Sequence, residues 1–301
     1  GSSDDLDYAA DVTVGPDGLI YVSGYNSSNV LRYNLTTGAF VDEFVTNNLG
    51  GLNGAFGIAF GADGNLYVGS HDGNSVLRYD GVTGAFIDTF VTAGSGGLSQ
   101  PTGMVFGSDG NLYVVGYTSH AVHRYDGDTG AFIDAFVIAG SGGLSFPEEV
   151  VFGPDGNLYV SSTGNDNVLR FNGSTGAFID EFVSSGSGGL DVATGLAFGP
   201  DGNLYVSSWE EDEILRFQGP DGASPGAFID VYVSGSGLRD AVYIDFVPSE
   251  QVTILDPTPA IDLDANDSSG STGSNFDTSF TEDAGAVLIA DADATLGNVT
   301  N

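Results

Sequence analysis

A 46-residue period runs through most of the 301-residue chain and limits what it can fold into. The dipeptide Asp-Gly, followed by an apolar segment, returns at this spacing, at Asp17, Asp63, Asp109, Asp155 and Asp201. Each period holds four short segments rich in Val, Ile, Phe and Tyr, separated by glycine-containing turns that supply the positive φ of tight hairpins. Four strands in a period of this length are typical of a β-propeller blade. We therefore predict an all-β fold, a β-propeller of four-stranded blades.

The third repeat illustrates the predicted strands. They are Gly103–Phe106, Asn111–Val114, Val122–Tyr125 and Ala131–Asp134. The first strand of each repeat is apolar without alternation, as in Val150-Val151-Phe152, because both faces of a blade are buried against its neighbours.

The sequence is compatible with two numbers of blades. Five periods run from about residue 10 to residue 238, and Val242–Val247 repeats the first strand of a sixth, with Val252–Leu255 as its candidate second strand. We predict a propeller over residues 1–255 with six blades, the last incomplete. A five-bladed ring with an appended strand pair is the alternative, and Asp245 favours it because other repeats carry Ala or Val there.

The charge balance excludes several classes of partner. The chain has 41 Asp and Glu against 6 Lys and Arg, a formal charge of −35, and would repel nucleic acids and anionic membranes. No apolar run approaches the roughly 18 residues of a membrane span, so we expect no membrane insertion. Without cysteine, disulfides and thiolate nucleophiles are excluded. The acidic, lysine-free composition suits an extracellular or cell-surface bacterial setting, with a monomeric propeller inside a larger chain.

The arginines are predicted to be structural. Five of the six occupy one repeat position on the third strand, at Arg32, Arg78, Arg124, Arg170 and Arg216. Each precedes an aspartate of the fourth strand by ten residues, or by fourteen in the fifth repeat. This spacing predicts a charge-assisted hydrogen bond within or between blades, in preference to an anion site.

Functional residues are sought where the repeats differ, since shared positions are explained by packing and turns. The loops between the second and third strands carry, at one equivalent position, Tyr25, His71, Tyr117, Thr163 and Trp209. These loops lie on the same rim as the connections between repeats. The aromatic residues of this variable rim could stack on a glycan or grip a protein segment; the alternative is that they only cover the rim.

Carboxylates replace small residues next to the predicted axis. Glu148-Glu149 stands where other repeats have Thr-Gly or a similar pair, and Asp11 replaces the same glycine in the first repeat. Converging carboxylate oxygens suit calcium, so Asp11, Glu148 and Glu149 are candidate metal ligands, with His120 as a weaker one. A solvated acidic rim is the alternative, and no HxH or HExxH spacing supports a histidine-based centre.

The repeat Pro101 to Val114, followed by Val122 to Asp126, resembles NHL repeats and the repeats of streptogramin (virginiamycin B) lyases. The resemblance covers residues 10–255 and implies the propeller fold. Such propellers include lyases, lactonases and binding modules, and the lyases use a metal with His and Glu near the axis. This chain reads Leu-Tyr-Val-Ser-Ser at Leu204 to Ser208 where the lyases typically read Leu-Trp-Phe-Thr-Glu. No catalytic residue is therefore carried over.

The composition changes after Leu255. Residues 256–275 form an acidic Pro/Ser/Gly linker. Together, Ile261–Asp267, Phe280–Glu282 and Ala286–Ala294 resemble the opening of cadherin-like repeats in bacterial surface proteins, so 276–301 would be the start of such a domain; a disordered tail is the alternative. Asp262, Asp264 and Asn266 alternate as in a calcium loop, but Asp267 and Gly273 stand where an EF-hand has Gly and Glu. Shared interdomain calcium is the weaker expectation here.

These patterns lead to one main hypothesis and one alternative. We expect a non-enzymatic extracellular binding propeller within a large bacterial surface or secreted protein, with a protein segment or glycan on the variable rim and calcium as its candidate cofactor. The alternative is a metal-dependent lyase or lactonase of the streptogramin-lyase type.

Overall fold

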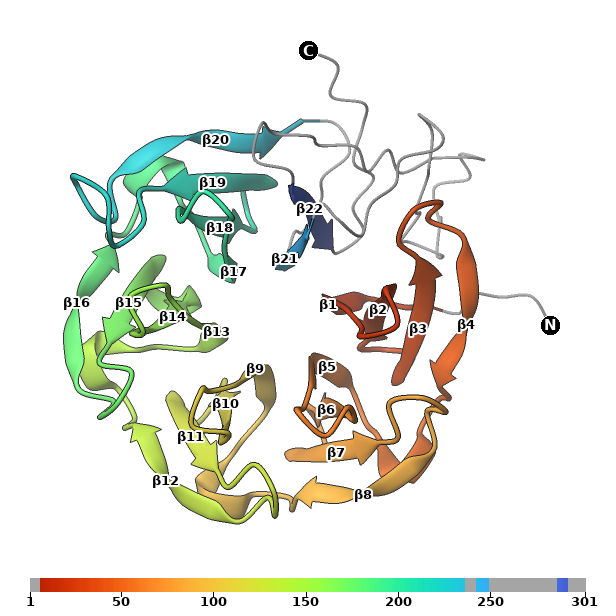
Figure 1. Cartoon of the computed structure of the whole chain (residues 1–301). Helices are drawn as coiled ribbons and strands as arrows, with labels where there is room; N and C mark the ends of the chain where they lie inside the picture. Colours follow the sequence, from red (N-terminus) through yellow and green to blue (C-terminus); the bar gives the residue numbers. More distant parts are fainter. Residues whose placement is uncertain (1–5, 236–241, 249–285, 292–301) are drawn as a thin grey trace.

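The computed structural model describes residues 6–235, 242–248 and 286–291. Its strands form five four-stranded antiparallel sheets arranged as blades around a central axis (Figure 1). In every blade the strands follow chain order, and the first strand lies nearest the axis while the fourth lies outermost (Figure 1). The prediction of an all-β propeller with four-stranded blades is confirmed.

The five blades have similar bounds once shifted by one period. The first contains β1 (Ala9–Val14), β2 (Leu19–Gly24), β3 (Asn29–Asn34) and β4 (Phe40–Val45). The second contains β5 (Ala55–Phe60), β6 (Leu66–Ser70), β7 (Ser75–Tyr79) and β8 (Phe86–Val91). The third contains β9 (Pro101–Phe106), β10 (Leu112–Gly116), β11 (Ala121–Tyr125) and β12 (Phe132–Val137). The fourth contains β13 (Pro147–Phe152), β14 (Leu158–Ser162), β15 (Asn167–Phe171) and β16 (Phe178–Val183). The fifth contains β17 (Ala193–Phe198), β18 (Leu204–Ser208), β19 (Glu213–Phe217) and β20 (Phe228–Ser234).

Aromatic side chains pack neighbouring blades together. Tyr21 on β2 is fully buried and makes edge-to-face contacts with Phe44 of its own blade and Phe60 of the next, at ring-centroid distances of 5.1 and 5.0 Å. Tyr67 repeats the arrangement one period later, with Phe90 and Phe106. Each such contact stabilises the fold by about 0.5–1.5 kcal/mol beyond the free energy gained by burying the rings, so the repeated tyrosine stabilises the packing of one blade against the next.

A polar contact also joins each of the first four blades to the next. The residue before the third strand has a positive φ, and its side chain accepts a backbone N–H from the following blade. Ser28 accepts from Gly54 at 2.9 Å, and Asn74 accepts from Gln100 at 2.8 Å. His120 occupies the same repeat position, so its role is explained by the repeat.

The predicted arginine pairing is confirmed and lies within each blade. Arg124 on β11 places Nε and Nη2 3.1 and 2.6 Å from the two carboxylate oxygens of Asp134 on β12. The guanidinium also stacks 4.9 Å from the ring centre of Phe136. The other four described arginines repeat this pairing, with Asp42, Asp88, Asp180 and Asp230.

The ring closes through a sixth, smaller sheet. Strand β21 (Tyr243–Pro248) contacts both β17 and β1, and pairs with β22 (Ala286–Asp291) in a two-stranded sheet (Figure 1). Five complete blades and a strand pair fit the five-bladed alternative, and a complete six-bladed ring is not confirmed. The candidate strand Val252–Leu255 and most of the predicted linker and cadherin-like segment lie outside the described residues.

Candidate functional site

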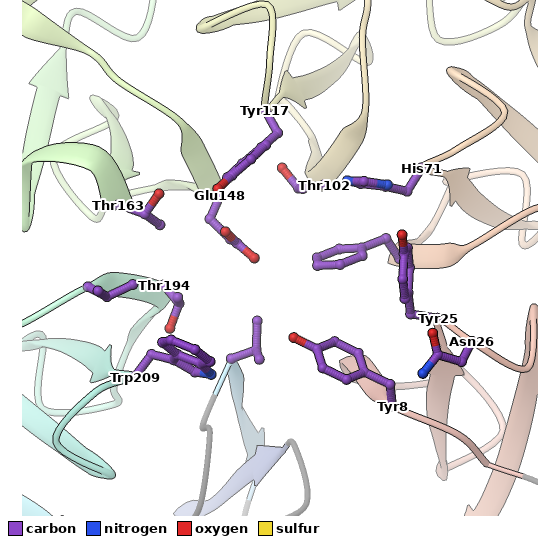
Figure 2. A pocket seen from close by; sticks show the side chains of 13 residues that line it. Tyr8, Tyr25, Asn26, His71, Thr102, Tyr117, Glu148, Thr163, Thr194 and Trp209 are labelled. Atoms are coloured by element: carbon purple, nitrogen blue, oxygen red, sulfur yellow. The ribbon is translucent and has the colours of Figure 1, made fainter.

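A cavity of about 530 Å³ opens at one end of the central axis (Figure 2). We call it the mouth pocket. Its walls come from all five blades and from the residue that precedes β21. The lining residues are Tyr8, Tyr25, Asn26, Phe56, His71, Thr102, Tyr117, Glu148, Thr163, Val192, Thr194, Trp209 and Val242.

The structure brings the predicted rim residues together at this pocket. Each of them directly follows the second strand of its blade, where the chain turns toward the third, so one repeat position reaches the cavity from every blade. Tyr25, His71, Tyr117 and Trp209 are all half-buried and line the pocket, with Thr163 completing the set.

The aromatic side chains form a packed group on one side of the pocket. Tyr25 makes edge-to-face contacts with Tyr8, Phe56 and His71, at centroid distances of 5.8, 5.9 and 5.3 Å. The hydroxyl of Tyr25 donates to Asp72, whose carboxylate also lies 2.9 Å from Nδ1 of His71. These contacts fix the rings before any ligand arrives.

Tyr117 and Trp209 stand apart from this group. Figure 2 shows Tyr117 and Trp209 entering from two other blades, so that aromatic surfaces face the cavity from several directions. Thr102 lies between Tyr117 and His71, Thr194 lies beside Trp209, and both supply hydroxyl groups (Figure 2). The pocket therefore combines broad apolar walls with few polar groups, as ligand sites usually do.

Glu148 is the one acidic side chain among the lining residues, and its carboxylate points into the cavity (Figure 2). Among the described residues, no hydrogen-bond donor reaches this carboxylate. Burial raises the pKa of Glu148 to about 7, because the surrounding protein replaces the water that would stabilise the charge. Near neutral pH the group therefore exists in both protonation states.

A second cavity of about 600 Å³ opens at the opposite end of the axis. Asp11, Glu149, Tyr243 and Asp245 line it. Glu148 and Glu149 are neighbours on β13, yet they line different cavities, so the structure separates the predicted pair. Tyr243 helps to divide the two cavities, because its hydroxyl donates to the carbonyl oxygen of Glu148 at 3.2 Å.

The position of Asp11 and Glu149 is one where inner strands nearly touch. In the second blade the position is Gly57, and a Cβ there would lie 2.0 Å from the carbonyl oxygen of Thr102. A Cβ on Gly103 would lie 2.5 Å from a carboxylate oxygen of Glu149. The acidic side chains thus fill space that neighbouring glycines leave open, and both are buried.

The acidic groups of this second cavity hold protons more tightly than usual. Burial raises the pKa of both Asp11 and Glu149 well above its usual range; repulsion by Asp245 adds to the shift of Asp11, and repulsion by Asp11 adds to that of Glu149. Burial also raises the pKa of Asp245 to about 6, although its carboxylate accepts the backbone N–H of Phe246 at 2.7 Å.

The described residues do not fit a preformed metal centre. The oxygens of Asp11 face the backbone N–H groups of Val12 and Ile58 at 2.7 and 2.6 Å, and Glu149 accepts the N–H of Val150. Nowhere in residues 6–235, 242–248 and 286–291 do three His, Asp or Glu side chains gather closely enough to hold a metal ion.

The weaker metal candidates are not brought to the axis. Nδ1 of His120 accepts the backbone N–H of Phe146 at 2.9 Å, and His120 lines neither cavity. Asp262, Asp264 and Asn266 lie outside the described residues, so calcium at the tail stays a prediction.

Several lining residues were missed by the sequence analysis. Tyr243 occupies the repeat position of Asp11 and Glu149, so the signal that identified those two would also have identified Tyr243. Tyr8 stands where later repeats have Gly54 or Gln100, a divergence that was readable in the sequence. Phe56 and Thr194 occupy the position of Glu148, and no single-sequence pattern separates them from core residues.

Comparison with known proteins identifies the fold but not a family. No protein-family model and no curated protein matches the chain. A catalytically inactive variant of virginiamycin B lyase from Staphylococcus aureus, with quinupristin, is 16% identical, with a TM-score of 0.60 over 81% of this chain and 76% of that one. A gluconolactonase from Xanthomonas campestris is 20% identical, with a TM-score of 0.61 over 81% and 80% of the two chains.

A third similar structure is the extracellular domain of BT4673 from B. thetaiotaomicron. It is 16% identical, with a TM-score of 0.57 over 83% of this chain and 33% of that one. At these identities the likeness shows the propeller fold alone, which agrees with the resemblance to streptogramin lyases and NHL propellers. The described part of the chain contains no helix of the length and apolarity that crossing a membrane requires.

Proposed function

We propose that the chain is an extracellular, non-enzymatic binding propeller of a bacterial surface or secreted protein, and that it binds its ligand in the mouth pocket. The observation that carries the proposal is that a repeat position with four different residue types in five blades converges on one cavity. Residues that differ between blades but share a pocket are expected of a recognition site, since packing alone would tolerate one residue type in all blades.

The size and chemistry of the pocket support small-ligand or side-chain recognition. Its volume of about 530 Å³ lies within the range of about 300–1,000 Å³ that is usual for ligand sites. Half-buried Tyr25, Tyr117 and Trp209 offer large contact areas at a low cost in side-chain entropy. A glycan or a protruding segment of a protein partner would suit such walls.

We further propose that β21 is the inner strand of a sixth blade. Phe246 on β21 contacts Tyr205 at a centroid distance of 4.8 Å, the contact that Phe60 makes with Tyr21 between the first two blades. Strand β22 pairs with β21, so the acidic segment that begins after residue 255 would lead back to this blade, with calcium as a stiffening element.

The binding proposal is tested with the variants Tyr117→Ala and Trp209→Ala, screened against glycans and peptides. The matched control is Phe178→Ala, which removes a partly exposed ring from outer strand β16. We expect the two pocket variants to lose ligand retention while their melting temperatures stay close to that of the unaltered protein. Equal retention in both pocket variants and the control would refute the proposal.

A metal-dependent lyase or lactonase is the second candidate function. The raised pKa of Glu148, about 7, favours it, because a general acid or base works best when its pKa lies near the working pH. The test is turnover of a streptogramin B antibiotic and of a gluconolactone with added calcium, by the unaltered protein and by Glu148→Gln. Turnover that Glu148→Gln abolishes would support the enzyme, and absence of turnover would remove it.

A further inference from the structure

We propose that the mouth pocket recognises an organic cation of the alkylammonium or quaternary ammonium class, with Glu148 as its counter-charge and the tyrosine and tryptophan rings as its walls. The inference rests on the proposed binding function and names the ligand chemistry for it. It also favours a lysine-bearing protein segment or a small amine over a neutral glycan.

A single acidic group sets the sign of the charge inside the pocket. Of its 13 lining residues, Glu148 alone is acidic, and Arg and Lys are absent from the lining. The five described arginines are each paired with an aspartate of their own blade, so none is available to neutralise Glu148. A chain of formal charge −35 adds a long-range attraction for cations.

Glu148 has no partner for its charge among the described residues. Within the described residues its carboxylate receives no hydrogen bond, although the side chain is half-buried among the residues that line the pocket. Burying an ionised carboxylate without a partner is unfavourable, and a cationic ligand supplies the missing partner. A neutral ligand would have to donate its own hydrogen bonds to the carboxylate, and an anionic ligand would be repelled by it.

Aromatic rings from several blades surround the cavity. Tyr25, Tyr117 and Trp209 come from three different blades and face the cavity from different sides, with the carboxylate of Glu148 between them (Figure 2). Aromatic faces attract cations through the ring quadrupole, Trp most strongly, and several rings around one point form the usual site for a quaternary ammonium group.

The titration of Glu148 gives the inference a distinctive signature. Tyr117, Tyr243 and Glu149 are the titratable groups coupled electrostatically to Glu148, while His71 and Tyr8 line the pocket farther along its wall. Burial raises the pKa of both tyrosines above the usual value, so they remain neutral at pH 7. A cation that ionises Glu148 should therefore release about half a proton at pH 7, because that carboxyl is about half protonated beforehand.

The experiment is calorimetric titration of the 301-residue chain with choline and with its neutral isostere 3,3-dimethylbutan-1-ol, in two buffers of different ionisation enthalpy. We expect choline to bind at least about tenfold more tightly than the isostere and to release protons. Glu148→Gln should abolish the proton release and remove the preference for the cation. Glu210→Gln, on the exposed loop next to Trp209, is the control for loss of one charge and should keep both.

Each outcome decides between the inference and the function on which it rests. Equal affinity for choline and the isostere, or an unchanged preference in Glu148→Gln, would overturn the cation inference. If a neutral glycan then binds and Trp209→Ala abolishes it, the binding function survives without the cation. If no probe binds in a manner that depends on Trp209, both fail.

A second arm identifies the source of the cation. A short peptide containing trimethyl-lysine is titrated against the same protein as choline. Tighter binding of the peptide would indicate a protein segment as the partner, while tighter binding of choline would indicate a small molecule. An unmodified lysine peptide serves as the control for contacts made by the peptide backbone.

Discussion

Replacing Glu148 by Gln should make the fold more stable in alkaline solution while leaving it nearly unchanged in acid. The pKa of Glu148 rises from its ordinary value of 4.5 to about 7 in the folded protein because of burial. Between these two values the folded state binds more protons than the unfolded chain, so the free energy of unfolding falls as the pH rises. Below pH 4.5 the contribution is fully present, and above about pH 7 it is lost.

The magnitude follows from the width of that interval. The range from 4.5 to about 7, at about 1.4 kcal/mol per pH unit, corresponds to about 3 kcal/mol. Gln keeps the shape of the side chain and carries no charge at any pH, so Glu148→Gln should escape this loss. For a domain of this size, about 3 kcal/mol corresponds to a shift in melting temperature of about 6–12 °C.

The assay is urea unfolding and thermal melting of the unaltered protein and of Glu148→Gln at pH 4.5 and pH 8. We expect the difference in unfolding free energy between the two proteins to move by about 3 kcal/mol in favour of the variant across this range. Glu210→Gln controls for the change in net charge. A difference that stays constant between the two pH values would refute the burial argument for Glu148.

Three further substitutions test the contacts that hold the blades. Arg124→Met should lower the free energy of unfolding by about 1–3 kcal/mol, because Asp134 loses its bidentate partner; chemical denaturation measures this, and Arg124→Lys should recover only part of it. Asn74→Ala should cost about 1 kcal/mol by leaving the N–H of Gln100 without its acceptor, and Asn74→Asp, which keeps an acceptor, should cost less in the same assay. Gly57→Ala should cost about 1–3 kcal/mol, because the new Cβ would collide with a backbone carbonyl of the next inner strand; a melting temperature equal to that of the unaltered protein would show that the inner strands can separate.

The fold could be predicted because each repeat carries the same local instructions. Asp-Gly turns, β-branched and aromatic runs and the constant 46-residue spacing all predict the same blade, and consistent local signals of this kind specify a structure well. The arginine pairing was predictable for the same reason. Closure of the ring could not be predicted, because it depends on strands from distant parts of the chain. Strand β22 pairs with β21 across an interval that carries no repeat.

The site could be predicted only in part. Divergence between repeats identified Tyr25, Tyr117 and Trp209, and the ring geometry then directs them into one cavity. The opposite destinations of Glu148 and Glu149 could not be predicted, because they depend on an irregular pairing of β13 with β14, where the register shifts between Pro147 and Val150. Similarly, the hydrogen bond from the backbone N–H of Phe146 to Nδ1 of His120 depends on the loop conformation, so the residue type alone could not predict it.

The mouth pocket spans the place where the two ends of the ring meet. Trp209 and Val242, which directly precedes β21, lie on one side of this seam, and Tyr8 and Tyr25 of the first blade lie on the other. A ligand that contacts both sides binds the closed ring and not an opened one, so its binding free energy adds to that of closure. An occupied pocket would therefore stabilise the closed ring. Conversely, the pocket would bind its ligand only while the ring is closed.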